Sequence, residues 1–118
     1  MISVGEHGRD AARSYLNRSK VAPLTQPIDF TLKDRVAIVT GAGSGIGHGI
    51  ALALAAAGAH LVVAGRTAAT LEAVRKEVEG IGRRALVVQA DVTSAGDIDT
   101  IVRRTQEGFG RIDILVNN

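Results

Sequence analysis

The segment Thr40-Gly41-Ala42-Gly43-Ser44-Gly45-Ile46-Gly47 decides the fold of this chain. It directly follows the apolar run 36–39, which has the composition of a buried strand, and it leads into Ile50, Leu54 and Ala57, which are spaced for one face of a helix. A glycine pattern alone is a weak signal. A glycine-rich turn between a buried strand and a buried helix is a specific one, because it is the context in which such turns bind nucleotide phosphates.

The glycines of this turn suit a phosphate for a physical reason. A helix N-terminus carries unpaired N–H groups and a partial positive charge, and a phosphate can reach them only where no Cβ intervenes. Gly41 is expected to make the tight turn out of the strand, Gly45 to let the backbone reach the phosphates, and Gly47 to let the helix lie close to the sheet. The plain alternative is a flexible loop that happens to be rich in glycine.

Length and composition predict one domain with an aliphatic core. The chain has 118 residues, of which 46% are hydrophobic and only 3% aromatic. A core of Val, Ile, Leu and Ala suits parallel strands that are buried on both faces. The chain has no cysteine, which excludes disulfides and thiolate chemistry and is compatible with a reducing cytoplasm.

Charge and hydropathy argue against two classes of partner. Fourteen cationic residues nearly balance twelve anionic ones, and no basic run appears, so nucleic-acid binding has little support. No apolar segment has the length of a membrane span, and residues 1–6 lack the pattern of a secretory signal. We therefore expect a cytoplasmic protein without nucleic-acid or membrane partners.

Strand and helix patterns alternate after residue 33. The expected strands are 35–40, 60–65, 84–90 and 111–116, and the expected helices are 45–58, 67–81 and one that begins at Ser94. This alternation predicts an α/β fold of the Rossmann type, a doubly wound parallel sheet with strand order 3-2-1-4 that stops after its fourth strand. The domain division that follows is an N-terminal arm over 1–31 and an incomplete dinucleotide-binding domain over 32–118.

The helix patterns also predict caps and buried faces. Thr67 and Ser94 are candidate N-caps, and Asp97 resembles the third position of a capping box. In the arm, residues 10–17 suit a short helix before Pro23. The faces expected to pack on the sheet are Leu71, Val74, Val78 and Ile81 in the second helix, and Ile98, Ile101, Val102 and Phe109 in the third.

The spacing T-G-x-x-x-G-x-G resembles that of the short-chain dehydrogenase/reductase family. Ile112 to Asn118 is similar to the family's apolar strand followed by Asn-Asn, and Asp91-Val92 is similar to its segment after the third strand. The resemblance covers residues 32–118. It implies the N-terminal part of an oxidoreductase that transfers hydride between a nicotinamide cofactor and a carbonyl or alcohol substrate, within a parent protein that we expect to form a homo-oligomer.

The end of the second strand distinguishes NADP from NAD. An acid about 20 residues past the glycines would bind the ribose 2′-hydroxyl of NAD, but the chain reads Ala64-Gly65-Arg66-Thr67 there. Arg66 offers a cation and planar donors that suit a 2′-phosphate, which favours NADP. Ser44 departs from many NADP-preferring relatives, which carry a basic residue at that position, and His48 is a candidate for added positive charge. The alternative is that Arg66 is an ordinary solvated residue.

The resemblance assigns further cofactor contacts. It implies that Asp91 accepts the adenine amino group beside the Val92 backbone, that Asn117 lies next to the cofactor, and that Asn118 ties strands together. From residue type alone, Asp91 equally suits the start of a helix, and both asparagines suit a turn. The residues expected to bind the cofactor are Gly41, Gly43, Ser44, Gly45, Ile46, Gly47, Arg66, Asp91, Val92 and Asn117.

The family's catalytic residues are not expected in this chain. They include a Tyr and a Lys in Y-x-x-x-K, whereas the single tyrosine here is Tyr15 and the residue four positions on is Ser19. Three scattered histidines without clustered acids or cysteines predict no metal site. Because the chain stops inside Asn117-Asn118, we expect a piece of a longer protein whose strand 111–116 lies at an unpaired edge.

Two other functions remain open at this point. One is a dinucleotide-binding module without catalysis. The other is a different user of the same fold, such as a nucleotide-sugar or methyl-donor enzyme, against which the glycine spacing and the Asn-Asn ending both speak.

Overall fold

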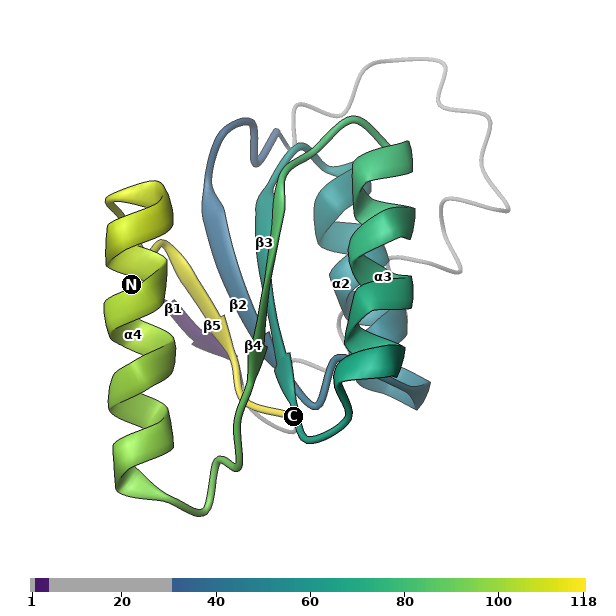
Figure 1. Ribbon diagram of the computed structural model, residues 1–118. Helices are drawn as coiled ribbons and strands as arrows, with labels where there is room; N and C mark the ends of the chain where they lie inside the picture. Colours follow the sequence, from purple (N-terminus) through teal and green to yellow (C-terminus); the bar gives the residue numbers. More distant parts are fainter. Residues whose placement is uncertain (1, 5–30) are drawn as a thin grey trace, which may run out of the picture.

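The computed structural model describes residues 2–4 and 31–118, and the helix expected over 10–17 lies outside them. None of the helices in this described part has the length and apolarity that a membrane crossing requires. In chain order the elements are β1 (Ile2–Val4), β2 (Val36–Thr40), α2 (Gly45–Ala56), β3 (His60–Gly65), α3 (Ala68–Gly80), β4 (Ala85–Gln89), α4 (Ala95–Phe109) and β5 (Ile114–Val116) (Figure 1).

The strands form one parallel sheet with the order β1-β5-β2-β3-β4. The strands β2, β3, β4 and β5 are the four that the sequence predicted, and their order in the sheet, β4-β3-β2-β5, confirms the expected order 3-2-1-4. β2 lies between β3 on one side and β5 on the other, with Ile38 opposite both Val62 and Leu115. The last strand is shorter than the expected 111–116, because it begins only at Ile114.

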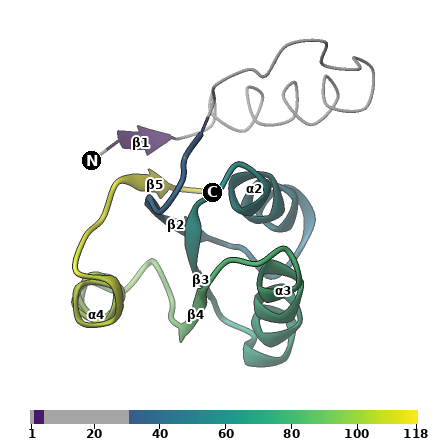
Figure 2. The same cartoon turned by 90° about the horizontal axis from the view of Figure 1, so that it is seen from above.

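Helices cover both faces of the sheet. Figure 2 shows α2 and α3 on one face and α4 on the other. The side chains of β2 alternate between them: Ala37 and Val39 belong to the core under α2 and α3, and Val36 and Ile38 belong to the core under α4. Since both faces are buried, the strand reads as a continuous apolar run, as parallel strands do.

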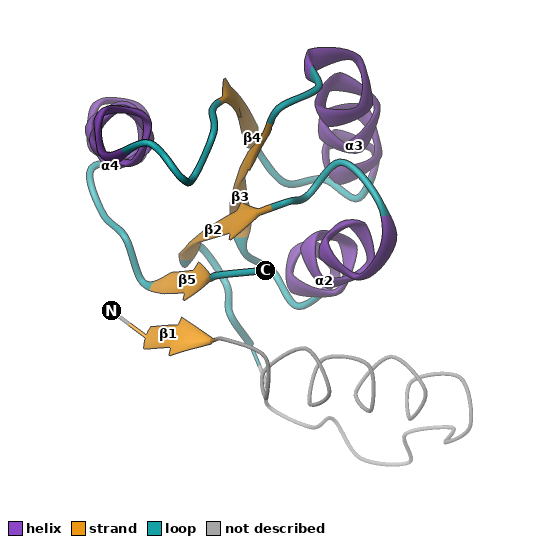
Figure 3. Cartoon of the chain, turned by 90° about the horizontal axis from the view of Figure 1, so that it is seen from below, coloured by secondary structure: helices purple, strands orange, loops and turns teal. Residues whose placement is uncertain are grey.

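The prediction that the last strand lies at an unpaired edge of the sheet is wrong. β1 pairs in parallel with β5, with Ile2 opposite Ile114 and Val4 opposite Val116. Figure 3 shows β1 next to β5 at that edge of the sheet. The backbone of an edge strand presents unpaired N–H and C=O groups, so any extended segment within reach is stabilised by pairing there.

Three apolar residues expected inside are exposed. Ile81 is 44% exposed because α3 ends at Gly80 and Ile81 is only its C-cap. On α4, Ile101 is buried as expected, but Ile98 and Val102 are 45% and 43% exposed. The helix rests on the sheet through Ile101 and Thr105, which leaves the other half of its apolar stripe open toward β2 and β5.

Asp113 fastens the amino end of β5 to the start of β2. Its Oδ2 accepts a hydrogen bond from the Val36 amide at 2.9 Å, and its Oδ1 accepts one from Arg111 at 2.7 Å. The Arg111 hydrogen bond is the main cause that lowers the pKa of the Asp113 carboxyl to about 2, and the Val36 amide and Arg35 also contribute. The ionised carboxylate therefore stabilises this end of the sheet.

This pKa predicts how stability depends on pH. Because the folded-state pKa lies below that of the unfolded chain, the contribution of Asp113 is complete above about pH 4 and is lost as pH falls toward 2. Asp113→Asn should lower the free energy of unfolding at pH 6 by on the order of 1 kcal/mol, and should flatten its decline between pH 4 and 2. Urea unfolding across this range measures both. Asp99→Asn, on the exposed side of α4, should leave the wild-type profile unchanged; an equal effect of the two variants would contradict the prediction.

Candidate dinucleotide-binding site

The predicted site residues lie at the carboxyl edge of the sheet. The loop after β2 carries the glycines, Arg66 follows β3, Asp91 follows β4 and Asn117 follows β5. After β2 the next strands, β3 and β4, are added on one side of β2, and β5 is added on its other side. The strand order therefore reverses at the carboxyl end of β2. Open α/β sheets bind ligands at such a point.

The backbone of the glycine loop requires glycine at two positions. Gly41 has φ +62° and Gly45 has φ +59°, values that residues with a side chain rarely adopt. A Cβ on Gly45 would meet no atom within 4 Å, so its side faces open space. Space for a ligand therefore exists at the start of α2.

Gly47 is required by close packing. A Cβ there would lie 2.1 Å from the Gly41 carbonyl oxygen and 2.6 Å from the side-chain nitrogen of Asn118. The absence of a side chain lets the first turn of α2 rest directly on the loop. The sequence predicted close packing of this glycine on the sheet, whereas its neighbours are the loop residue Gly41 and Asn118, which follows β5.

The N-terminus of α2 has no side-chain cap. Its N-cap, Ser44, is extended and makes no side-chain hydrogen bond to the helix, and the first turn holds no acid. The N-terminus of α4 differs, since Ser94 Oγ accepts a hydrogen bond from the Asp97 amide. This is one half of the expected capping box; the Asp97 carboxylate accepts from the Asp91 amide and not from the Ser94 amide. The free N–H groups and dipole of α2 are therefore available to an anion.

Thr40 and Asn118 hold the loop on the sheet. The buried Thr40 hydroxyl donates to the Val116 carbonyl at 3.3 Å and accepts from the Asn118 amide at 3.1 Å. The Asn118 side chain donates to the Gly41 carbonyl at 3.2 Å. These bonds confirm that Asn118 ties β5 to β2. The Thr40 hydroxyl was not among the predicted site residues; its place directly before the first glycine was the available signal.

A small pocket of about 190 Å³ separates the glycine loop from the start of α3. Arg66 and Ser44 are both exposed and both line this pocket. Thr70 packs so closely that a Cβ on Gly43 would lie 2.5 Å from its hydroxyl, so Gly43 sets the distance between loop and helix. Thr67 is the N-cap of α3 as expected, but its side chain makes no capping hydrogen bond. Thr67 and Thr70 were missed as pocket residues, because only the fold brings α3 to the loop.

Asp91 is held by its own turn. Its Oδ1 accepts hydrogen bonds from the Thr93 hydroxyl at 2.7 Å and the Thr93 amide at 2.9 Å, while its amide donates to Asp97 at 2.7 Å. The Thr93 bonds are the main cause that lowers the pKa of the Asp91 carboxyl, and the charge of Arg66 adds to them. Asp91 is thus an ionised acceptor with a fixed orientation.

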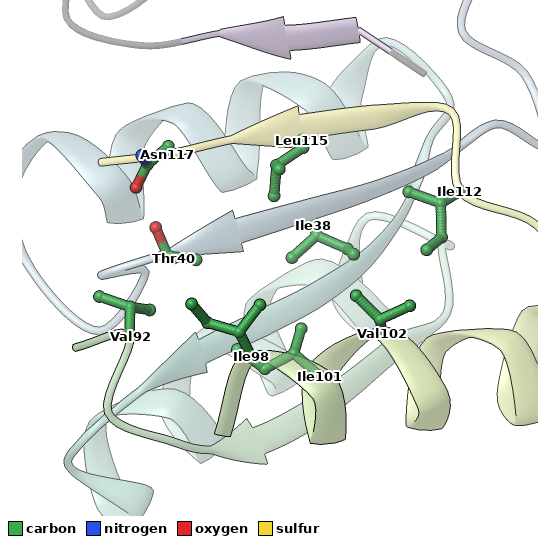
Figure 4. Close-up of a pocket in the computed structure, with 9 residues that line it drawn as sticks. All are labelled: Ile38, Thr40, Val92, Ile98, Ile101, Val102, Ile112, Leu115 and Asn117. Carbon is green, nitrogen blue, oxygen red and sulfur yellow. The ribbon is translucent and has the colours of Figure 1, made fainter. Parts of the chain in front are cut away.

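A second pocket, of about 230 Å³, lies between α4 and the strands β2 and β5. Figure 4 shows Thr40, Val92 and Asn117 at its end near the glycine loop, while the remaining lining is apolar. The exposed Ile98 and Val102 of α4 belong to this lining. The structure thus places Val92 and Asn117 together, on the opposite face of the sheet edge from Arg66.

His48 does not face the rim of the small pocket. Its Nε2 lies 3.0 Å from Glu77 Oε1, so the ring joins α2 to α3. The structure therefore does not bring His48 to Arg66, where the sequence made it a candidate for added positive charge; its ring contacts Glu77. Within residues 2–4 and 31–118 no group of His, Cys, Asp and Glu is arranged to hold a metal ion.

Comparisons with known proteins agree with this geometry. The family model described as short chain dehydrogenase matches residues 35–118. An uncharacterized oxidoreductase of Mycobacterium tuberculosis is 43% identical over 89 residues, which are 75% of this chain and 34% of that protein. The short chain dehydrogenase/reductase astE of Aspergillus oryzae is 48% identical over 90 residues, with the same two shares.

A solved structure is also similar to this chain. The L-sorbose reductase of Gluconobacter frateurii, in complex with NADPH and L-sorbose, has a TM-score of 0.75 and 38% identity, and the match covers 77% of this chain and 35% of that one. The chain thus spans about a third of the length of these relatives. Motif, strand order and family model together show that the chain belongs to the short chain dehydrogenase family.

Proposed function

We propose that this chain is the cofactor-binding part of an NADP-dependent oxidoreductase. The observation that carries the proposal is the N-terminus of α2, which has no side-chain cap. It is reached through two glycines with positive φ, and it lies at the point where the strand order reverses. In this proposal Gly41, Gly43, Ser44, Gly45, Ile46 and Gly47 form the pyrophosphate cradle.

Arg66 supports NADP over NAD. It stands at the rim of the 190 Å³ pocket, where the chain offers no acid to a ribose hydroxyl. A guanidinium matches a phosphate in charge and donor geometry. The NADPH found in the related L-sorbose reductase structure is consistent with this preference.

Asp91, Val92 and Asn117 are proposed to contact the rest of the cofactor. Asp91 Oδ1 is occupied by Thr93, and the ionised carboxylate suits an exocyclic adenine amine. Val92 and Asn117 both line the pocket between α4 and the strands β2 and β5, although Val92 follows β4 and Asn117 follows β5. The cofactor would extend along this edge from Arg66 toward Asn117.

The nicotinamide supplies the hydride chemistry when bound, and this chain supplies binding and orientation. We propose a small carbonyl or alcohol substrate for the whole protein, a homo-oligomeric state and a cytoplasmic location. Groups that exchange the proton with the substrate oxygen are not assigned to any residue of this chain.

The NADP preference has a direct test. Calorimetric titration should show tighter binding of NADPH than of NADH, and Arg66→Asp should reduce the NADPH affinity by roughly 10–100-fold with little loss for NADH, because a charge-assisted bond is lost. Arg103→Asp, on the exposed side of α4, makes the same charge change away from the site and should leave both affinities unaltered. Equal affinities for NADPH and NADH in the unmodified chain would refute the preference.

A binding module without catalysis is the second candidate. It is favoured by one observation, the single Tyr15 with Ser19 four positions on. NADPH binding without reduction of any of a panel of ketones by the whole protein would support it, whereas turnover by the whole protein would exclude it.

A further inference from the structure

Gln89 is bonded to the residue proposed to select NADPH. It is the last residue of β4 and lies exposed at the carboxyl edge, opposite Gly65 in the sheet register. Its side-chain Nε2 donates a hydrogen bond of 2.9 Å to the Arg66 carbonyl. The sheet itself contributes no bond to that carbonyl, because β3 ends at Gly65.

The main chain before and after Arg66 is fixed by other bonds. The Gly65 carbonyl accepts from the Ala90 amide at 2.7 Å, and the Thr67 carbonyl accepts from the Leu71 amide at 3.2 Å and the Thr70 hydroxyl at 2.9 Å. Gln89 therefore holds the Arg66–Thr67 peptide, the middle one of the three between the end of β3 and the start of α3. With the peptides on both sides of Arg66 held, its Cα has a fixed position from which the side chain extends.

The Arg66 side chain is exposed, and no ion pair fixes it among the described residues. Its charge adds to the lowered pKa of the Asp91 carboxyl, which Thr93 holds in place. A fixed backbone reduces the entropy that Arg66 loses when it binds a phosphate.

We propose that Gln89 is a positioning residue for selection of the 2′-phosphate, acting through the Arg66 carbonyl. This inference rests on the proposed role of Arg66 in NADPH binding. It assigns Gln89 no contact with the cofactor. The expected consequence is that Gln89 affects NADPH affinity and leaves NADH affinity unchanged.

The test is a double-mutant cycle read by calorimetry with NADPH and NADH. Gln89→Met keeps the side-chain length and removes the donor. It should weaken NADPH binding by about three- to tenfold, the usual effect of one hydrogen bond, with NADH affinity unchanged. In an Arg66→Ala background the same substitution should have no further effect on NADPH. Gln106→Met on exposed α4 is the matched control, and circular dichroism checks that every variant folds.

The outcomes separate this inference from the proposed function. Parallel losses for NADPH and NADH would show a merely structural role and overturn the inference, as would an unchanged NADPH affinity or a loss that persists without Arg66. In each of these cases the preference for NADPH in the unmodified chain still stands. Equal binding of the two cofactors by the unmodified chain would instead overturn the preference itself, and the inference with it.

Discussion

Gly45→Val is expected to weaken NADPH binding by at least about 100-fold, or about 2.7 kcal/mol. Gly45 has φ +59°, and no atom lies within 4 Å of the place where its Cβ would stand. In the protein without ligand the valine therefore meets only backbone strain, on the order of 1–2 kcal/mol. In the complex its two methyl groups would occupy the space through which a phosphate reaches the N–H groups of α2.

A second glycine provides a matched control. Gly82, in the turn between α3 and β4, also has a positive φ, +97°, and open space around its Cβ position. Gly82→Val should cost similar stability and leave NADPH affinity at the wild-type value. Calorimetry on both variants, with thermal unfolding alongside, separates strain from occlusion. Normal binding by a folded Gly45→Val variant would show that the phosphates lie elsewhere.

Gly47→Ala is expected to destabilise the fold by roughly 2–3 kcal/mol. A single methyl group would stand 2.1 Å from the Gly41 carbonyl oxygen, so either α2 or the loop must move. The neighbour is backbone, which cannot rotate away as a flexible side chain can. The helix propensity of alanine, up to about 1 kcal/mol better than glycine, offsets only part of this cost.

The control for this prediction is Gly80→Ala. Gly80 is the last residue of α3 and has no atom within 4 Å of its Cβ position. The substitution should be neutral or stabilising by up to about 1 kcal/mol. Urea unfolding midpoints compare the two variants. If Gly47→Ala were as stable as Gly80→Ala, the close contact between α2 and the loop would be wrong.

The sequence predicted the centre of the fold because local signals and burial agree there. β2 is buried on both faces, so its residues must be apolar throughout, and the left-handed turns at Gly41 and Gly45 need glycine. These constraints fix residue type, and the pattern could therefore be interpreted without the structure. The order of the four strands followed from their alternation with helices.

The edges of the fold were predicted less well, for a physical reason. Periodicity identifies an apolar helix face and gives no information on what covers it, so Ile98 and Val102 were expected inside and are exposed. Pairing of β1 with β5 joins segments more than 100 residues apart, and no local pattern encodes such a contact. The site shows the same limit: Gln89 and Thr70 are ordinary polar residues until the fold brings them to Arg66 and Gly43.

We propose above all that the loop from Gly41 to Gly47 and the start of α2 bind the phosphates of a nicotinamide dinucleotide. Titration of the ¹⁵N-labelled chain with NADPH, followed by amide chemical shifts, tests it residue by residue. We expect the largest shifts at the amides of Gly43 to Gly47, with further shifts at Arg66 and Val92, and little change at the opposite edge of the sheet around Arg83 and Asp113. Shifts centred away from the glycine loop, or no shifts at millimolar NADPH, would contradict it.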